Sequence, residues 1–157
     1  MKHSSRTGKV LGIALATVVA GSVTLPAFAG LGGDAASVDA DVVKMKGQAR
    51  ATPIAGYTMS EITLPSGTVV HEFISAEGKV FAVSWKGMAV PDLSQTLGTY
   101  FAEYKTAATA TPHAGHHNLT VQQPDLVVRT GGHMRNWYGQ AYVLSLLPPN
   151  FSLDEIK

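Results

Sequence analysis

The clearest pattern along the chain is an alternation of apolar and polar residues across residues 57–86. A period of two is typical of strands with one buried face. Short glycine-containing breaks at 65–67 and 76–78 divide this segment into three parts, as tight hairpins require. We therefore expect a three-stranded antiparallel meander. One face of its last strand should carry three large residues, Phe81, Val83 and Trp85.

Two other segments have apolar residues at the spacings of three and four that are typical of amphipathic helices. Residues 34–50 also place Asp before Lys and Arg, the order that the helix dipole favours. We expect a helix there, followed by a linker at Pro53 and Gly56. A second helix should begin at Pro91-Asp92 and pack across the meander. Its apolar stripe consists of Leu93, Leu97, Tyr100, Phe101 and Tyr104.

The C-terminal part returns to strand patterns, with short strands expected around Leu119 and over 126–130, a turn at Gly131-Gly132 and a long strand over 133–144. The segment 107–118 has no apolar periodicity and is expected to be a flexible loop. The sequence thus predicts an α+β fold. Its single antiparallel sheet has five to six strands, formed by the meander and a C-terminal hairpin, with an N-terminal helix and one helix packed across the sheet.

Residues 1–29 predict a cleaved signal peptide. A basic start precedes an apolar run over 10–23, and Ala27-Phe28-Ala29 supplies the small residues that a signal peptidase requires. We expect cleavage before Gly30, leaving a single domain over 30–157 that is exported to the periplasm or beyond the cell. Polar residues interrupt the apolar run before the roughly 20 residues that a membrane span needs, and no later segment is expected to cross a membrane.

Loss of this leader changes the charge balance. The full sequence has 12 Lys and Arg against 11 Asp and Glu, and because the leader holds three of these bases and no acid, nine bases remain against 11 acids. Nucleic acid and anionic lipid both require clustered Lys and Arg, so neither is expected as a partner. The chain has no cysteine, which excludes disulfides, thiolate metal sites and thiol catalysis.

Several blocks of the sequence resemble a known family. The blocks are Gly32-Gly33, residues 78–85 with Pro91-Asp92-Leu93, residues 132–139, Leu146-Leu147-Pro148 and Asp154-Glu155-Ile156. In these blocks the chain resembles the exported proteobacterial proteins catalogued as domain of unknown function 2844, over nearly all of its mature length. The block 132–139 is the most specific. The resemblance implies export and a shared fold, and it implies no catalytic residue because the family has no assigned activity.

One histidine cluster has the character of metal ligands. It consists of His113, His116 and His117, and neutral imidazoles so close in sequence can share Zn²⁺, Cu²⁺ or Ni²⁺. A protein site normally needs three or four ordered ligands, but this loop has no carboxylate before Asp125 and is not a feature of the resembled family. A solvated loop is the favoured interpretation. The alternative is a small-ligand or metal-binding periplasmic protein that uses these histidines with His133.

No motif predicts an enzyme or a cofactor. Serines, histidines and acids can be combined into a triad, but no serine lies in a Gly-x-Ser-x-Gly elbow. Asp154 and Glu155 are adjacent, and neighbours on a helix do not face each other. Gly131-Gly132 lacks the context of a phosphate-binding loop. An uncharacterised hydrolase is therefore only the third hypothesis, and we expect no catalytic residue.

The segment 129–142 gathers aromatic, basic and glycine residues. Strand alternation puts Trp137 on one face of the sheet and Tyr138 and Tyr142 on the other. If the Trp137 face is buried, the two tyrosines are exposed to solvent. The alternative is that a helix covers each face and all three rings are buried. Gly139 within this strand indicates a bulge or a close contact. Our leading hypothesis is a non-enzymatic exported module that binds a protein or envelope component through this sheet face and hairpin. The residues expected to bind the partner are His133, Met134, Arg135, Trp137, Tyr138 and Tyr142.

Overall fold

The computed structural model describes residues 30–110 and 118–156. The expected signal peptide and the three loop histidines, His113, His116 and His117, lie outside the described residues. The helices are α1 (Ala35–Lys44), α2 (Leu93–Thr96), η1 (Gly98–Tyr100), α3 (Phe101–Ala110), η2 (Leu144–Leu146) and η3 (Leu153–Glu155). The strands are β1 (Gln48–Ile54), β2 (Tyr57–Thr63), β3 (Val69–Ser75), β4 (Val80–Gly87), β5 (Leu119–Gln122), β6 (Leu126–His133) and β7 (Asn136–Val143).

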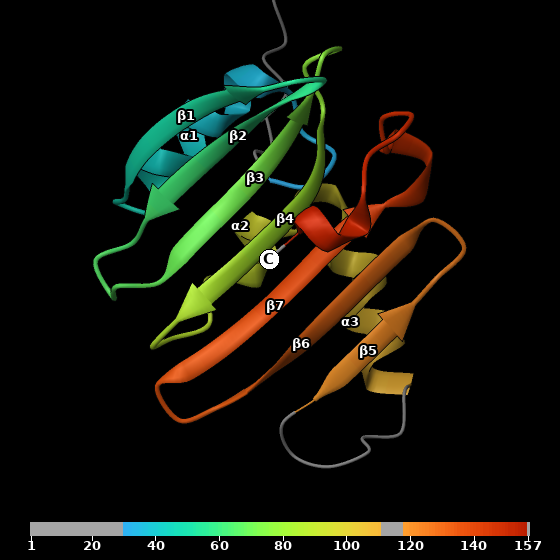
Figure 1. Ribbon diagram of the computed structural model, residues 1–157. Helices are drawn as coiled ribbons and strands as arrows, with labels where there is room; N and C mark the ends of the chain where they lie inside the picture. The colour runs from blue at the N-terminus through green and yellow to red at the C-terminus, as the bar shows by residue number, and fades with distance from the viewer. Residues whose placement is uncertain (1–29, 111–117, 157) are drawn as a thin grey trace, which may run out of the picture.

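The strands of the described residues form one antiparallel sheet in the order β1-β2-β3-β4-β7-β6-β5. Helices α1, α2 and α3 lie on one face of this sheet, and the C-terminal segment lies on the other (Figure 1). The α+β class, the meander, the N-terminal helix and the helix across the sheet are confirmed. The sheet has seven strands rather than five to six, because β1 is a strand that the sequence did not predict.

The strand β1 takes the place of the last three residues of the expected N-terminal helix and of most of the linker expected after it. Helix α1 ends at Lys44, Lys46 has a left-handed backbone (φ 52), and the chain then reverses. All seven residues of β1 are exposed, so no apolar alternation marks it as a strand. Pro53, expected in a linker, lies within β1 instead, which is tolerated because β1 is an edge strand.

The expected second helix is divided into α2, η1 and α3. The division lies at Gly98, whose backbone is left-handed (φ 50), so this glycine breaks the helix. The predicted apolar stripe is confirmed as core. Leu97 is fully buried, and the other four stripe residues are partly buried against the same cluster. Helix α3 continues to Ala110, so the expected loop is wrong for residues 107–110.

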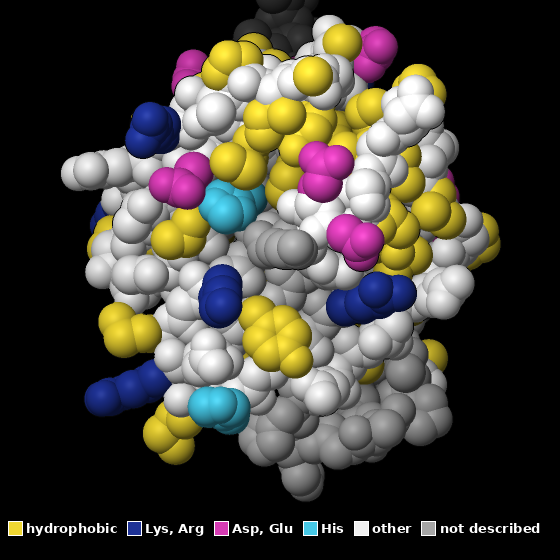
Figure 2. All heavy atoms as spheres, viewed as in Figure 1, with side chains coloured by type: hydrophobic (Ala, Val, Ile, Leu, Met, Phe, Trp, Pro, Cys, Tyr) yellow, Lys and Arg dark blue, Asp and Glu magenta, His cyan; other side chains and the backbone are white. Residues whose placement is uncertain are grey.

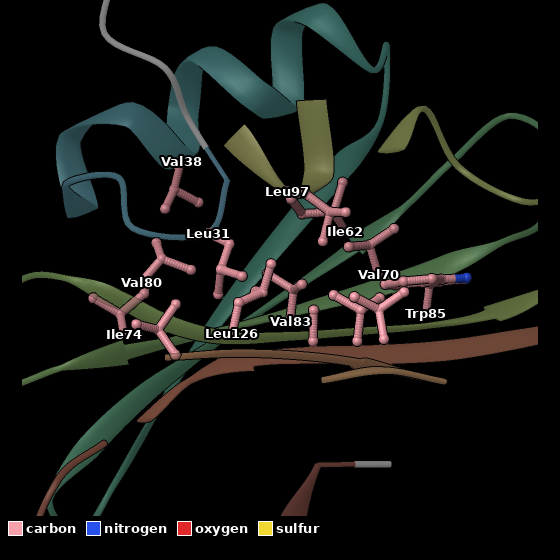
Figure 3. Packing of buried hydrophobic residues seen from close by; sticks show 14 residues of the cluster. Leu31, Val38, Ile62, Val70, Ile74, Val80, Val83, Trp85, Leu97 and Leu126 are labelled. Carbon is pink, nitrogen blue, oxygen red and sulfur yellow. The ribbon is translucent and has the colours of Figure 1, made fainter. Parts of the chain in front are cut away.

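The larger core cluster lies between the sheet and the helices. Figure 3 shows Val38 and Leu97 above the sheet, facing the apolar side chains of the strands. A second cluster lies on the opposite face, where the C-terminal segment packs on the sheet. It contains Phe73, Phe81, Ala82, Val127, Tyr142 and Ile156. Phe151 packs against it and contacts Phe81 with a ring-centroid distance of 4.7 Å.

A register shift in β4 changes one predicted face. Phe73 pairs with Ala82 but Ile74 pairs with Val80, so Phe81 is an extra residue opposite this step. A bulge of this kind breaks the alternation of side chains. Phe81 therefore lies in the second cluster with Ala82, and the prediction that it shares a face with Val83 and Trp85 is wrong.

The C-terminal hairpin also turns later than the glycines suggested. Residues 131 and 132 are paired within β6, and the turn consists of Met134 and Arg135, with Arg135 in the left-handed region (φ 66). The two glycines are therefore part of the strand β6 and not of the turn. A Cβ atom on Gly132 would lie 2.3 Å from the carbonyl oxygen of Asn136, so only glycine fits this close approach of β6 and β7.

The predicted close contact at Gly139 is confirmed. Gly139 pairs with Trp85 across β4 and β7, and a Cβ atom on Gly139 would lie 2.2 Å from Cζ2 of that indole. The ring therefore lies directly on the backbone of β7. This contact fixes Trp85 in the core, where only 3% of the residue is exposed.

Gly139→Ala tests this contact. The added methyl group has no space unless the buried indole moves, so we expect a loss of about 1–3 kcal/mol in the free energy of unfolding. Chemical denaturation measures this loss. Thr120→Ala on the exposed side of β5 is the control, with a change within about 0.5 kcal/mol. Equal stability of the Gly139→Ala variant and the native chain would contradict the described packing.

Candidate functional site

The face opposite the helices has an apolar part and a polar part. Strand register aligns its residues in rows that run across the sheet. The apolar row consists of Met59, Phe73, Ala82, Tyr142 and Val127. The polar row, one step along the strands, consists of Glu61, His71, Ser84, Gln140, Arg129 and Thr120. The C-terminal segment packs on the apolar row, and the members of the polar row other than Ser84 are at least partly exposed.

We define the open face as the polar row together with Lys86, Tyr138 and Gly131, which form the next row on β4, β7 and β6. The register places His71 on this face, a direction that the sequence left undecided. Its Nε2 atom lies 3.2 Å from Oε2 of Glu61. Ser84 is buried between neighbouring strands, whereas Lys86 and Arg129 are exposed.

Tyr138 is the aromatic residue of the open face. It pairs with Gly131, and a Cβ atom on that glycine would lie 2.6 Å from the Tyr138 hydroxyl and 2.7 Å from Cζ. The ring therefore lies low across β6, on a strand position that has no side chain. Half of Tyr138 is exposed, so one side of the ring rests on the backbone and the other is available to a ligand.

The residues that were predicted to bind a partner differ in their exposure to solvent. His133, Met134, Arg135 and Tyr138 are exposed, and Met134 reaches 84% exposure. Trp137 belongs to the alternate set of β7 residues and is partly buried. Tyr142 is 4% exposed within the second cluster. Because the C-terminal segment covers Tyr142, this ring is part of the core and does not belong to the available surface.

A pair of buried carboxyl groups lies on the helix side of the sheet. Asp41 comes from α1 and Glu72 from β3, and neither residue is exposed. The two carboxyl groups are within hydrogen-bonding reach of each other, yet none of their four oxygens has a donor among the described residues. Two ionised carboxylates can only accept hydrogen bonds, so a proton held between them supplies the missing donor.

Burial sets the ionisation of this pair. It raises the pKa of Glu72 to about 8, and the neighbouring Asp41 charge and hydrogen bond act in the same direction. Burial also raises the pKa of Asp41 to about 6, although the hydrogen bond from Glu72 and the charge of Lys44 oppose the rise. At neutral pH the pair therefore retains a proton.

Sequence reasoning missed this pair for a physical reason. In the sequence Asp41 is one of several acids that precede the bases of the N-terminal helix, and its burial depends on how α1 lies on the sheet. Glu72 carried a detectable signal, because alternation puts it on the same face as Val70 and Ile74, which are both buried. A charged residue between two buried aliphatic neighbours needs a partner from another element.

Asp41 and Lys44 also border a hollow of about 470 Å³ between α1 and the segment from α2 to α3. Gln95, Thr99 and Phe101 are among its other lining residues. A second hollow of about 480 Å³ lies beside Tyr57 and Phe151. The Tyr57 hydroxyl donates to Oε2 of Glu155 at 2.6 Å, and burial together with this carboxylate raises the pKa of Tyr57 to about 12.

Within residues 30–110 and 118–156, no three His, Asp or Glu side chains are grouped closely enough to hold a metal ion. The proposed metal ligands of the loop fall outside these ranges, and His133 lies at the exposed end of β6 without such a group around it. The open face and the buried carboxyl pair are therefore considered below without a metal ion.

The carboxyl pair makes stability depend on pH. Both folded-state pKa values lie above the ordinary values of 3.8 and 4.5, so the folded chain keeps protons that the unfolded chain releases. This contribution is therefore greatest below the unfolded pKa values and is lost as pH rises through the folded ones. We expect the free energy of unfolding to fall by more than about 1 kcal/mol between about pH 5 and pH 8.

Urea denaturation across this pH range measures the slope, and Glu72→Gln is expected to reduce it, because the amide does not titrate and still donates to Asp41. Glu77→Gln, in the exposed turn between β3 and β4, is the matched control and should keep the native slope. A Glu72→Gln slope equal to that of the native chain would refute the shared proton.

No helix in the described residues has the length and apolar content needed to cross a membrane. Neither the curated proteins nor the solved structures include a match to this chain. The family model described as "Protein of unknown function (DUF2844)" matches residues 27–156. That range spans the helices, every strand of the sheet and the C-terminal segment that covers the apolar row. The chain therefore belongs to the DUF2844 family.

Proposed function

We propose that this protein is an exported, non-enzymatic binding module that contacts a protein or envelope component through the open face and the hairpin 129–142. The observation that carries the proposal is Tyr138, a half-exposed ring that lies on the sheet beside polar and basic side chains. An aromatic ring of this kind offers a large contact area together with a hydroxyl group. Placed on a rigid sheet, it loses little conformational freedom on binding.

The tip of the hairpin extends this surface. Met134 is 84% exposed, and Arg135 next to it is also exposed. Methionine adapts its shape to a partner, and arginine provides several directed donors, so both residue types are enriched in interfaces. The exposure of four predicted residues supports the proposal; these are His133, Met134, Arg135 and Tyr138. Tyr142 is buried, so it stabilises the sheet and does not contact a partner.

Site-specific photo-crosslinking in the producing cell tests the proposal. We expect a photoreactive residue at Met134 to give an adduct of defined mass, because this side chain projects from the binding surface. The same residue at Val43, which is 77% exposed on α1, is the matched control and should give none. Adding Tyr138→Ala should reduce the Met134 adduct at least about fivefold, the effect of losing roughly 1 kcal/mol of binding.

The amount of exported protein and its melting temperature serve as further controls. A loss of the Met134 adduct on Tyr138→Ala is attributed to lost binding only if both quantities match those of the native chain. An adduct of the same mass from both Met134 and Val43 would show nonspecific contact. Absence of any adduct from Met134 at normal expression would refute the proposed surface.

A further inference from the structure

Resting on the proposed function, we infer that the open face binds an acidic polysaccharide, a chain of sugar rings that carry carboxylate groups. In this arrangement one sugar ring stacks on Tyr138, and carboxylate groups along the polysaccharide are bound by Lys86 and Arg129. The inference names the class of envelope component, which the proposed function leaves open.

The first support is the position of the ring. Because Gly131 has no side chain, Tyr138 lies low across β6 with its outer side in solvent. A flat ring exposed on one side suits the apolar side of a sugar ring, which is also flat. A partner protein would more often insert its own side chains into pockets, and the lining residues of the described hollows do not include Tyr138.

The second support is the charge around the ring. Lys86 is directly opposite Tyr138 on β4, and Arg129 is two residues from Gly131 on β6. Figure 2 shows dark-blue Lys and Arg side chains in the lower half of this face, where no magenta acidic side chain is visible. Two acids near this region already have partners, since Glu61 contacts His71 and Glu155 accepts from Tyr57.

The third support is the spacing and chemistry of the polar row. Arg129 on β6 lies between Gln140 on β7 and Thr120 on β5, all three are at least partly exposed, and neighbouring strands are about 4.8 Å apart. This separation is comparable to the length of one sugar unit, so successive units can meet successive strands. Amides and hydroxyls bind sugar hydroxyls, while guanidinium groups bind carboxylates in a bidentate manner. The centre of the open face is polar and charged, unlike the apolar centre of a protein interface.

Titration calorimetry with the mature chain tests this inference, using polygalacturonate oligomers as the probe. We expect binding to polygalacturonate, no binding to neutral dextran of equal length, and no binding to poly-L-glutamate of equal charge. Arg129→Gln should weaken polygalacturonate binding about tenfold. Lys105→Gln, an equal charge change at an exposed position of α3 on the helix side of the sheet, should leave binding unchanged.

A pair of substitutions separates stacking from charge. Tyr138→Leu keeps an apolar side chain but has no flat ring, whereas Tyr138→Phe keeps the ring, so the Phe variant should bind polygalacturonate more tightly than the Leu variant. Equal binding by these two variants would overturn the stacking role. Equal affinity for poly-L-glutamate and polygalacturonate would overturn the sugar and point to an acidic peptide instead.

Absence of polygalacturonate binding by the mature chain would also overturn the inference. The proposed function is tested separately, since photo-crosslinking at Met134 does not depend on the probe. If Met134 gives an adduct but the chain does not bind polygalacturonate, the proposed binding surface stands and the acidic polysaccharide is rejected as its ligand. Failure of both measurements would reject the binding surface as well.

Discussion

The pairing of β4 with β7 is the contact on which the rest of the structure depends. It joins the meander, which is local in sequence, to the three C-terminal strands, and the residues that it pairs are 50 to 60 positions apart. Trp85 and Gly139 face each other within it. Without this pairing there would be two small sheets, each with an exposed edge, and neither would offer the helices a continuous surface.

The same pairing creates the two sides of the molecule. On one side the helices and the sheet enclose the larger core and the buried carboxyl pair. On the other side the C-terminal segment covers only the apolar row. The open face lies beside this covered part of the sheet. An antiparallel sheet can accept such a solvated region when its outward residues are polar, and the polar row meets this condition.

Features that depend on neighbouring residues were predictable from the sequence. The meander strands follow from alternation and glycine turns, and the helical stripe follows from its spacing, because both patterns repeat within a few residues. The strand β1 lacked such a pattern, since both of its faces are exposed. Phe81 departs from alternation because a bulge depends on the partner strand. Tyr138 and Tyr142 have the same place in the alternation, and only the distant C-terminal segment decides that Tyr142 is buried while Tyr138 is not.

The exposed strand β1 also bears on how the protein avoids self-association. An edge strand with free backbone groups on one side is a template on which another chain can add a strand. In β1, Pro53 has no N–H group to offer an incoming strand, and Arg50 places a charge on the edge. Neither residue adds to the core, yet both make the edge a poor site for aggregation. The residues of β1 thus disfavour the addition of another strand at this edge.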